Sequence, residues 1–582
     1  MSYIDFPSLD SKQHLDSFFQ DELVFFYFHF TCNLKYTDFT YFSNRFDNVF
    51  SLLKKQMNVD KDNTLPFLIS FYKLIANTRD IHSGKGERDI SYMMLWKLYS
   101  HFPSLAIFLL HRFVQQVDEQ PFVYGSWRDI KYFCDFVKQH SRHHENDTLI
   151  DICIELINTQ LKKDIDTWKC SENPMDSRFI SNVAKWIPRE NKRFDWLFHR
   201  LAQHWGETHY PYIFKSVHDY NSKVKAGNKY KLLYRKNVSF MNKALDTIEI
   251  KLCANRRHLI EPRNVTLRNF TKYKNVVFNH SDNSDHVKCG EDITDFFEDK
   301  YSNFIQHFNF VQPQYMYYKY NTSSSLPVSH YVKEAISCIS KHNCKDNSQF
   351  RILNKQWDYM SNLLDGGLSD FILPIIDISS SMRKYNDDPL YSAIGFAILV
   401  SQHSFIKNRI LAIDNVPIWI QLDDNMTFIQ KVHTIIKHIS SLYSTKASYI
   451  QACNLLGKSF LQSSTSHHNI QNMQFVFFSS FIKEPYDSSS IYDTITNTLS
   501  EYTAIKPHIS FWNLSKYDTA QLPCSSNQYN TKLISGYSSH LISHLHNRNK
   551  YVSYNPYTTI YDILNKYQYQ VLENYVRSVV YM

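Results

Sequence analysis

The first 205 residues carry apolar side chains at the spacing of α-helices. Apolar positions recur at intervals of three and four in residues 67–75 and again in residues 93–99. Turn-like segments separate such stretches, for example HSGKGERD at 82–89 and VYGSWRD at 123–129. This pattern predicts helical pairs without a strict sequence repeat, as in a degenerate, HEAT-like α-solenoid.

From about residue 366 short apolar runs alternate with helical stretches. This alternation predicts a Rossmann-like α/β domain with a parallel sheet. In such sheets ligands bind at the carboxyl ends of the strands. The expected strands are 371–377, 409–414, 416–422, 474–480 and 508–514, and the expected helices are 389–405, 426–440 and 448–462.

The predicted domains are a helical repeat domain at 1–365, an α/β domain at 366–545 and a C-terminal helical tail at 546–582. Residues 280–350 are polar and lack apolar periodicity, so a loop-rich insertion is expected there.

The amino-acid composition argues against a disordered, a membrane-spanning or a secreted protein. With 43% hydrophobic and 21% charged residues, the chain can bury cores. No apolar run reaches the roughly 18–20 residues that a membrane span needs, and the N-terminus does not resemble a secretory signal. The ten cysteines form no CxxC pair, so we expect reduced thiols in a cytoplasmic protein. Low glycine and high aromatic content indicate an AT-rich genome.

Basic charge is concentrated in one segment. Residues 222–275 hold fourteen Lys and Arg against three Asp and Glu, a net charge of +11, whereas the whole chain carries +8. Aromatic residues such as Tyr230, Tyr234 and Phe240 are interleaved with them. Phosphate contacts and base stacking both favour such a surface. The segment is interpreted either as a nucleic-acid contact surface or as a solvated helix face.

A D-x-S-x-S motif follows the first expected strand. Asp377, Ser379 and Ser381 supply a carboxylate and two hydroxyls, which are hard oxygen ligands suited to Mg²⁺. The alternative is a capped helix start, in which the hydroxyls accept backbone N–H groups.

The motif resembles the metal-ion-dependent adhesion site of von Willebrand factor type A domains. Further motifs include TRDIHSGKGERDISY (78–92), YGSWRDIKYF (124–133), AKWIPRENKRFD (184–195), YRKNVSFMNKALDTIEIKLCAN (234–255), QWDYMSNLLDGGLSDFILPIIDISSSM (356–382), FWNL (511–514) and LISGYSSHLI (533–542). In this order they resemble an uncharacterised family of plants, bacteria and large DNA viruses that is similar to TROVE/Ro ribonucleoproteins.

The resemblance implies a fold and a function. It implies a TROVE-like helical domain joined to a von Willebrand factor type A domain. Ro relatives form a helical ring that binds small structured RNAs and single-stranded RNA ends. A non-enzymatic RNA-binding protein of a large DNA virus is therefore expected, located in the host cytoplasm or the virion. The alternative is a protein-interaction or virion scaffold that binds a protein partner through its type A face, without RNA or membrane.

The chain departs from the family pattern at the metal site. Ser448 stands where the family has a threonine, with Thr445 as a near neighbour, and Ser480 stands where an acid is expected. A site with one carboxylate gives a divalent ion less charge compensation, so we expect Mg²⁺ to bind weakly or not at all. The degenerate site comprises Asp377, Ser379, Ser381, Ser448 and Ser480.

The remaining candidates concern RNA. The turn at 84–89 lacks P-loop spacing and is interpreted as a helix–helix turn or as an RNA-facing loop. Trp127 and Trp186 are interpreted as core packing or as base-stacking residues. No catalytic or zinc motif is found, so no enzymatic activity is expected. The candidate RNA-binding residues are Lys229, Lys231, Arg235, Lys236, Lys243, Lys251, Arg256, Arg257, Lys85, Arg88 and Arg128.

Overall fold

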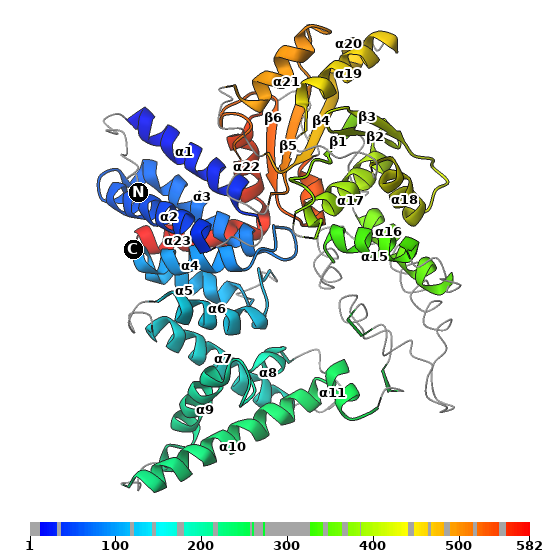
Figure 1. Cartoon of the computed structure of the whole chain (residues 1–582). Coiled ribbons are helices and arrows are strands. Elements are labelled where there is room, and N and C mark those ends of the chain that lie inside the picture. The colour runs from blue at the N-terminus through cyan, green and yellow to red at the C-terminus, as the bar shows by residue number, and fades with distance from the viewer. Residues whose placement is uncertain are drawn as a thin grey trace. The chain divides into compact units, whose positions relative to one another are not determined.

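A computed structural model shows two compact units, one formed by residues 1–101 and 289–582 and the other by residues 102–288 (Figure 1). Within the described residues, no helix is both long and apolar enough to cross a membrane. The structure describes residues 12–31, 36–116, 122–141, 147–170, 180–213, 219–256, 259–260, 272–273, 326–340, 347–363, 371–384, 386–439, 447–463, 467–481, 489–515, 521–545 and 554–581.

The first unit contains a six-stranded sheet in the order β3-β2-β1-β4-β5-β6. All neighbouring strands are parallel except β2 and β3, which form an antiparallel pair at one edge. The sheet is therefore mixed, and the expectation of a purely parallel sheet was wrong at this edge, because only four residues separate the two strands. The strands are β1 (Phe371–Asp377), β2 (Arg409–Ile413), β3 (Ile418–Gln421), β4 (Met473–Ser479), β5 (His508–Asn513) and β6 (Thr531–Ser535).

Helices cover both faces of this sheet, because successive side chains of a buried strand point to opposite sides. On one face Phe478 of β4 and Trp512 of β5 pack against Phe396 of α17 (Asp388–His403). On the other face Phe475 packs against Phe460 of α19 (Tyr449–Gln462). The α/β part of the prediction is confirmed at this level. The unit also contains α18 (Phe428–Ile439), α20 (His467–Gln471) and α21 (Ile491–Ser500).

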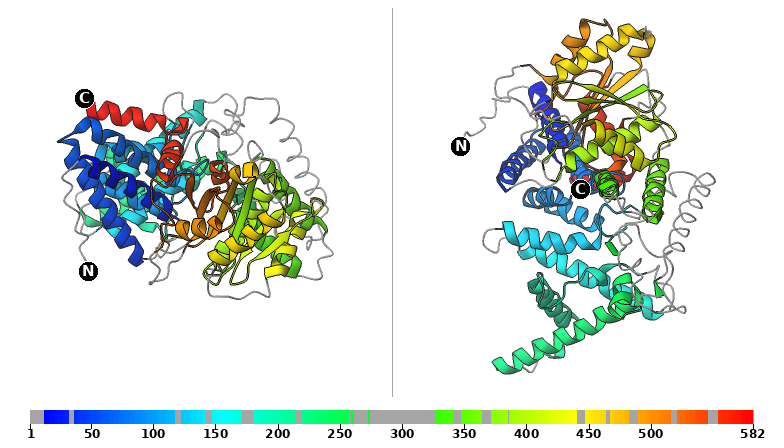
Figure 2. Two further views of the ribbon diagram at one scale, coloured as in Figure 1. Left: turned by 90° about the horizontal axis from the view of Figure 1, so that it is seen from above. Right: turned by 45° about the vertical axis from the view of Figure 1, so that its right-hand side comes forward.

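The N-terminal helices belong to the same unit as the sheet. They are α1 (Lys12–His29), α2 (Tyr36–Met57), α3 (Lys61–Arg79) and α4 (Asp89–His101). The C-terminal helices α22 (Pro556–Leu564) and α23 (Gln570–Tyr581) pack against α1 and α3, and Figures 1 and 2 show α23 in red among the blue N-terminal helices. One compact unit therefore contains both ends of the chain. The boundaries between the units lie at residues 101/102 and 288/289, whereas the predicted domain boundary lies at residue 365.

Buried polar contacts connect these distant segments. Lys73 of α3 donates to Glu573 of α23 at 2.6 Å. Asn77 of α3 donates to the Tyr569 hydroxyl at 3.0 Å, and that hydroxyl donates to Asp80 at 2.8 Å. Because buried polar groups are costly when unpaired, these bonds fix the C-terminal helices against α3.

Part of the expected loop-rich insertion is helical. Residues Val328–Ser340 form α15 and residues Asn347–Leu363 form α16. Apolar side chains at Val328, Tyr331, Val332 and Ala335 make one buried face, which packs against α17 and α18. The prediction of a loop overlooked this short amphipathic pattern. Residues 280–325 of that insertion lie outside the described residues.

The second unit is helical. Its helices are α5 (Pro103–Arg112), α6 (Trp127–His140), α7 (Asp147–Cys170), α8 (Val183–Trp186), α9 (Asp195–His209), α10 (Tyr220–Ala244) and α11 (Ile248–Cys253). The longest is α10, which begins at the N-cap Asp219, whose side chain accepts from the Ser222 N–H. It packs against α9, α8 and α7, as the right-hand view of Figure 2 shows for α9.

Candidate functional site

Helix α10 presents a line of lysines to solvent. Lys225, Lys229, Lys236 and Lys243 are exposed and follow one another at intervals of four, seven and seven residues. Because seven residues span nearly two helical turns, all four lie on one face, over about 27 Å of helix. We call these four residues the lysine stripe. Leu232 and Phe240, also exposed, lie beside it on the same face.

The opposite face of α10 holds the helix in place. Ala226, Tyr230, Tyr234 and Met241 are buried there. Tyr234 packs against Phe198 and Trp205 of α9, and its hydroxyl donates to Asn158 of α7 at 2.9 Å. Since Tyr230 and Tyr234 pack inward, they fix the direction in which the lysines point, whereas Phe240 is exposed beside the stripe.

Ion pairs divide the predicted basic residues into two groups. Glu190 pairs with Arg235 at 2.6 Å and with Lys231 at 3.7 Å, and Asp246 pairs with Lys251 at 2.8 Å. In contrast, no acidic side chain of the described residues pairs with any member of the lysine stripe. Within the described part of the chain, the positive charge of the stripe is thus uncompensated.

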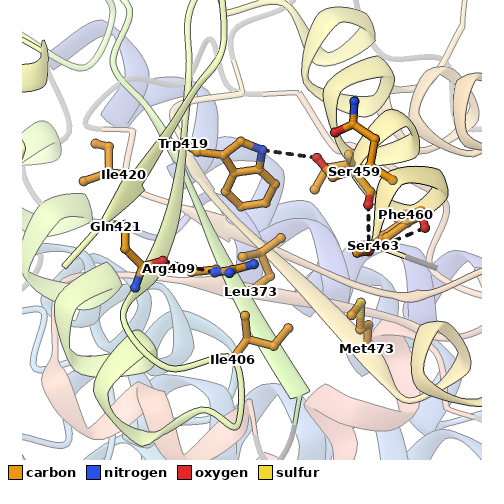
Figure 3. A pocket seen from close by; sticks show the side chains of 12 residues that line it. Leu373, Ile406, Arg409, Trp419, Ile420, Gln421, Ser459, Phe460, Ser463 and Met473 are labelled. Atoms are coloured by element: carbon orange, nitrogen blue, oxygen red, sulfur yellow. Dashed lines mark hydrogen bonds between the residues drawn. The ribbon is translucent and has the colours of Figure 1, made fainter. Parts of the chain in front are cut away.

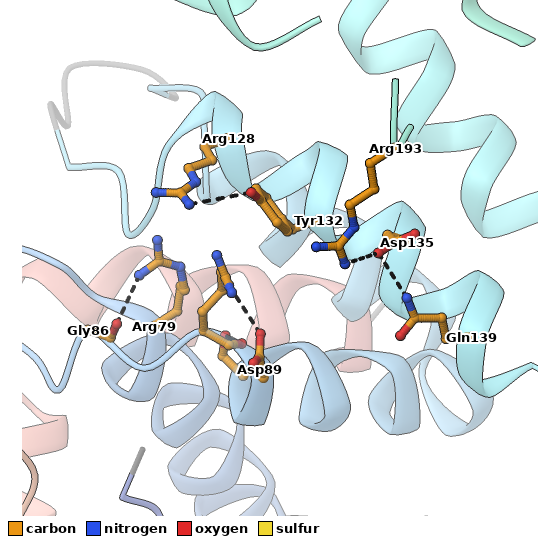
Figure 4. Close-up of polar contacts among 10 residues, drawn as sticks. Arg79, Gly86, Asp89, Arg128, Tyr132, Asp135, Gln139 and Arg193 are labelled. Carbon is orange, nitrogen blue, oxygen red and sulfur yellow. Dashed lines mark hydrogen bonds and ion pairs between the residues drawn. The ribbon is translucent and has the colours of Figure 1, made fainter. Parts of the chain in front are cut away.

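A second basic feature of this unit surrounds Trp186. The Lys131 ammonium lies 5.2 Å and the Arg128 guanidinium 5.5 Å from the centroid of the half-buried indole ring. The Arg128 guanidinium donates to the Tyr132 hydroxyl at 3.4 Å, and Figure 4 shows the two side chains pointing toward each other. Burial lowers the pKa of the Lys131 ammonium, and Arg128 acts in the same direction. No acidic side chain in the described parts of the chain neutralises Lys131 or Arg128.

Two other cations of this unit, Arg193 and Lys185, differ from Arg128 and Lys131, because each has an acidic partner. Arg193 pairs with Asp135 at 3.1 Å (Figure 4), and Lys185 pairs with Glu249 at 3.1 Å. The Trp186 ring packs against α6 residues and keeps an exposed part. Base stacking by this ring stays a prediction. Trp127 is buried, with 8% of its surface exposed, so it is a packing residue.

The turn at 84–89 is a helix–helix junction. Lys85 is buried, and its ammonium donates to the carbonyls of Tyr27 and Phe30 and to the Ser535 hydroxyl. The prediction that Lys85 contacts RNA was therefore wrong, because its ammonium group is buried and bonded to acceptors inside the protein. Arg88 pairs with Asp89 at 3.1 Å, and Arg79 donates to the Gly86 carbonyl at 3.4 Å (Figure 4). Arg256 is exposed, and Arg257 lies outside the described residues.

The D-x-S-x-S motif lies at the carboxyl end of β1, as predicted, and a chain of hydroxyls extends from it. Ser381 lies 2.9 Å from Ser379 and 2.8 Å from Ser480, measured between hydroxyl oxygens. Asp377 accepts the backbone N–H of Ser379 at 2.9 Å and the Ser479 hydroxyl at 2.6 Å. The fold thus brings four of the five predicted site residues together.

Asp414 adds a second carboxylate to this edge of the sheet. It follows β2 directly, and the Ile378 N–H donates to the carbonyl of the preceding residue, Ile413, at 3.2 Å. The residue is only 3% exposed, and its Oδ1 has no hydrogen-bond partner among the residues that the structure describes. Burial raises the pKa of the Asp377 carboxyl, and the nearby Asp414 adds to this rise, whereas hydrogen bonds from Ser479 and Ser379 oppose it.

Sequence reasoning missed Asp414, although the signal was present. The run RILAID ends in an acid after a buried strand, as FILPIID does. Ser448 reaches the same edge through its backbone, since its N–H donates to the Asp414 carbonyl at 3.2 Å. Its hydroxyl accepts the Gln451 N–H and caps α19. Thr445 lies outside the described residues.

Few acidic side chains at this edge of the sheet could act as ligands of a metal ion. Within the residues that the structure describes, no three His, Cys, Asp or Glu side chains come together as a metal-ligand cluster. A cation here would therefore rely on two carboxylates, Asp377 and Asp414, with hydroxyls and water completing its shell. The unpaired Asp414 oxygen fits such an ion, because a buried carboxylate needs a compensating positive charge.

Two comparisons relate the chain to known proteins. A family model described as a domain of unknown function (DUF7788) matches residues 372–555, which include strands β2 to β6 and all of β1 except Phe371. The chain is also similar to the uncharacterised protein L728 of Acanthamoeba polyphaga mimivirus, with 22% identity over 537 residues, covering 90% of this chain and 83% of that protein. The similarity to a viral protein thus extends through both compact units.

Proposed function

We propose that the protein binds RNA, without enzymatic activity, through the lysine stripe of α10. The observation that supports this most is the alignment of four exposed lysines on one face of a packed helix, none of them paired with an acidic side chain of the described residues. Phosphates are recognised by such cations, and the released counterions drive binding. The Trp186 ring, flanked by Arg128 and Lys131, supplies a stacking surface in the same unit. Single-stranded RNA fits both features.

The fold supports a Ro-like version of this function. We infer that the α/β part is a von Willebrand factor type A domain and that the helical segments are TROVE-like. Support comes from the D-x-S-x-S turn at the carboxyl end of a central strand and from helices on both faces of the sheet. A location in the host cytoplasm or the virion is part of the same proposal.

The test replaces all four lysines of the stripe with glutamine. We expect the purified wild-type protein to bind a single-stranded RNA with an affinity that falls steeply with salt. In the variant, the log–log slope should flatten by about 2 to 3 units, because each lost phosphate contact removes roughly 0.7. Fluorescence anisotropy at a series of salt concentrations measures both affinity and slope.

A matched control keeps the overall charge change the same. Glutamine replacing Lys54, Lys55, Lys407 and Lys458 also removes four exposed positive charges, all outside α10. This variant should bind RNA as the wild type does. Equal losses in the two variants would show that only net charge matters. Absence of wild-type binding even at low salt would refute RNA binding and favour a scaffold that binds a protein partner.

We also propose that the carboxyl edge of the sheet holds a divalent cation such as Mg²⁺, which would support the scaffold function. The specific observation is Asp414, a buried carboxylate near Asp377 whose Oδ1 has no hydrogen-bond partner among the described residues. The hydroxyls of Ser379, Ser381 and Ser480 lie at the same edge of the sheet. When bound, such an ion supplies positive charge and exchangeable coordination positions for an acidic group of a protein partner.

Replacing Asp414 with asparagine tests the cation site. In the presence of chelator, the variant should be at least as stable as the wild type, because one of two neighbouring buried charges is gone. At a Mg²⁺ concentration about ten times the Kd, the wild type should gain about 1.4 kcal/mol and the variant almost nothing. Thermal melts at matched ionic strength measure this. Asp423→Asn, at an exposed position, is the control; a wild type that does not respond to Mg²⁺ would contradict the proposal.

A further inference from the structure

A pocket of about 510 Å³ lies at the opposite end of the sheet from Asp377. Residues near the amino ends of three parallel strands line it, together with the edge strand β3 and the helix α19 (Figure 3). Neither the hydroxyl chain nor the lysine stripe contributes to it. A pocket of this size accommodates a small organic molecule.

Most of the pocket wall is apolar. Leu373, Ile420, Leu456 and Phe460 are buried and present hydrocarbon surface. Trp419 is half-buried, and its indole N–H donates to the Ser459 hydroxyl at 3.3 Å (Figure 3). This bond satisfies the polar edge of the indole, so the remaining ring surface is available to an apolar ligand. Trp419 and Phe460 together favour a flat, aromatic body.

Arg409 supplies the charge at the rim. It is the first residue of β2 and is exposed, and its Nε donates to the Gln421 side chain at 3.0 Å (Figure 3). Among the described residues, no Asp or Glu lines the pocket and no acidic side chain pairs with Arg409. The other guanidinium N–H groups form a fork of the kind that binds carboxylates and sulfonates in a bidentate manner.

We propose that this pocket binds a small organic anion with an apolar, flat body. The carboxylate or sulfonate pairs with Arg409, and the body lies between Trp419 and Phe460. The proposal does not depend on RNA binding or on the cation site, because it uses neither set of residues.

A pair of probes that differ in charge tests the proposal on the full chain. Isothermal titration compares 1-naphthalenesulfonate with the neutral 1-naphthalenemethanol. The sulfonate should bind the wild type about 10-fold or more tightly, as expected for a charge-assisted bidentate contact. Arg409→Gln should remove this difference and leave the binding of the neutral probe unchanged. Trp419→Ala should weaken both probes.

The control is Lys458→Gln, which removes an exposed charge from α19 outside the pocket lining and should bind both probes as the wild type does. Arg409 is exposed, so its variant should fold, which circular dichroism verifies. Equal affinity of the Arg409 variant and the wild type for the sulfonate would overturn the proposal. So would the absence of saturable binding up to about 1 mM, a concentration at which even a weak site fills.

Discussion

Replacing Lys85 with methionine is expected to lower the free energy of unfolding by about 2 to 4 kcal/mol. The Lys85 ammonium donates to the Tyr27 and Phe30 carbonyls at the end of α1 and to the Ser535 hydroxyl at the end of β6. Methionine keeps the apolar stem but leaves these buried acceptors short of a donor. Chemical denaturation measures the loss. Lys54→Met, at an exposed position of α2, should change stability by less than about 0.5 kcal/mol.

The difference between wild type and Lys85→Met should also depend on pH. Burial lowers the pKa of the Lys85 ammonium to about 7, whereas the unfolded chain has a pKa near 10.4. Between these values the unfolded state binds one more proton, so the stability of the wild type relative to the variant rises with pH. We expect a gain of about 2 kcal/mol between pH 6.5 and 9. The opposite trend would show that the three acceptors hold the charged form more strongly than burial disfavours it.

Alanine substitutions at two glycines of the helical unit are expected to change the free energy of unfolding in opposite directions. A Cβ on Gly206 of α9 would lie 2.1 Å from Cγ of the buried Tyr230 ring, so Gly206→Ala must push α10 away from α9. We expect a destabilisation of about 1 to 3 kcal/mol. At Gly227 of α10, such a Cβ would meet no atom of the described residues within 4 Å beyond its chain neighbours and its own helix backbone. Gly227→Ala should therefore stabilise the protein by about 0.5 to 1 kcal/mol, because glycine is unfavourable within helices.

The two glycine variants also test whether RNA binding by the lysine stripe requires an ordered helix α10. Gly206→Ala keeps every lysine but disturbs the packing at Tyr230, so RNA affinity should fall in proportion to the loss of α10 order, measured by hydrogen exchange. Gly227→Ala should bind RNA at least as well as the wild type. Unchanged affinity in Gly206→Ala, despite a destabilised α10, would mean that the lysines act as a flexible basic segment.

Local patterns of the sequence determined the strands and much of the helical structure. The runs at 371–377 and 474–480 became β1 and β4 within one residue, because a fully buried strand needs continuous apolar side chains. Asp377 was identifiable for the same reason, since an acid that ends such a run lies at the carboxyl edge. The weaker pattern of β6, Thr531–Ser535, did not stand out, because its burial depends on β5 and α1 and not on its own composition.

The sequence by itself determined where basic charge gathers and where a hydroxyl turn follows a strand. Only the tertiary structure decided which charges remain available. Lys85 and Lys229 look alike in the sequence, but one donates to buried acceptors and the other is exposed on α10. Asp414 became the neighbour of Asp377 because β2 pairs with β1. The physical reason is the same in each case: local periodicity fixes an element and its buried face, whereas partners distant in sequence fix the environment of each charge.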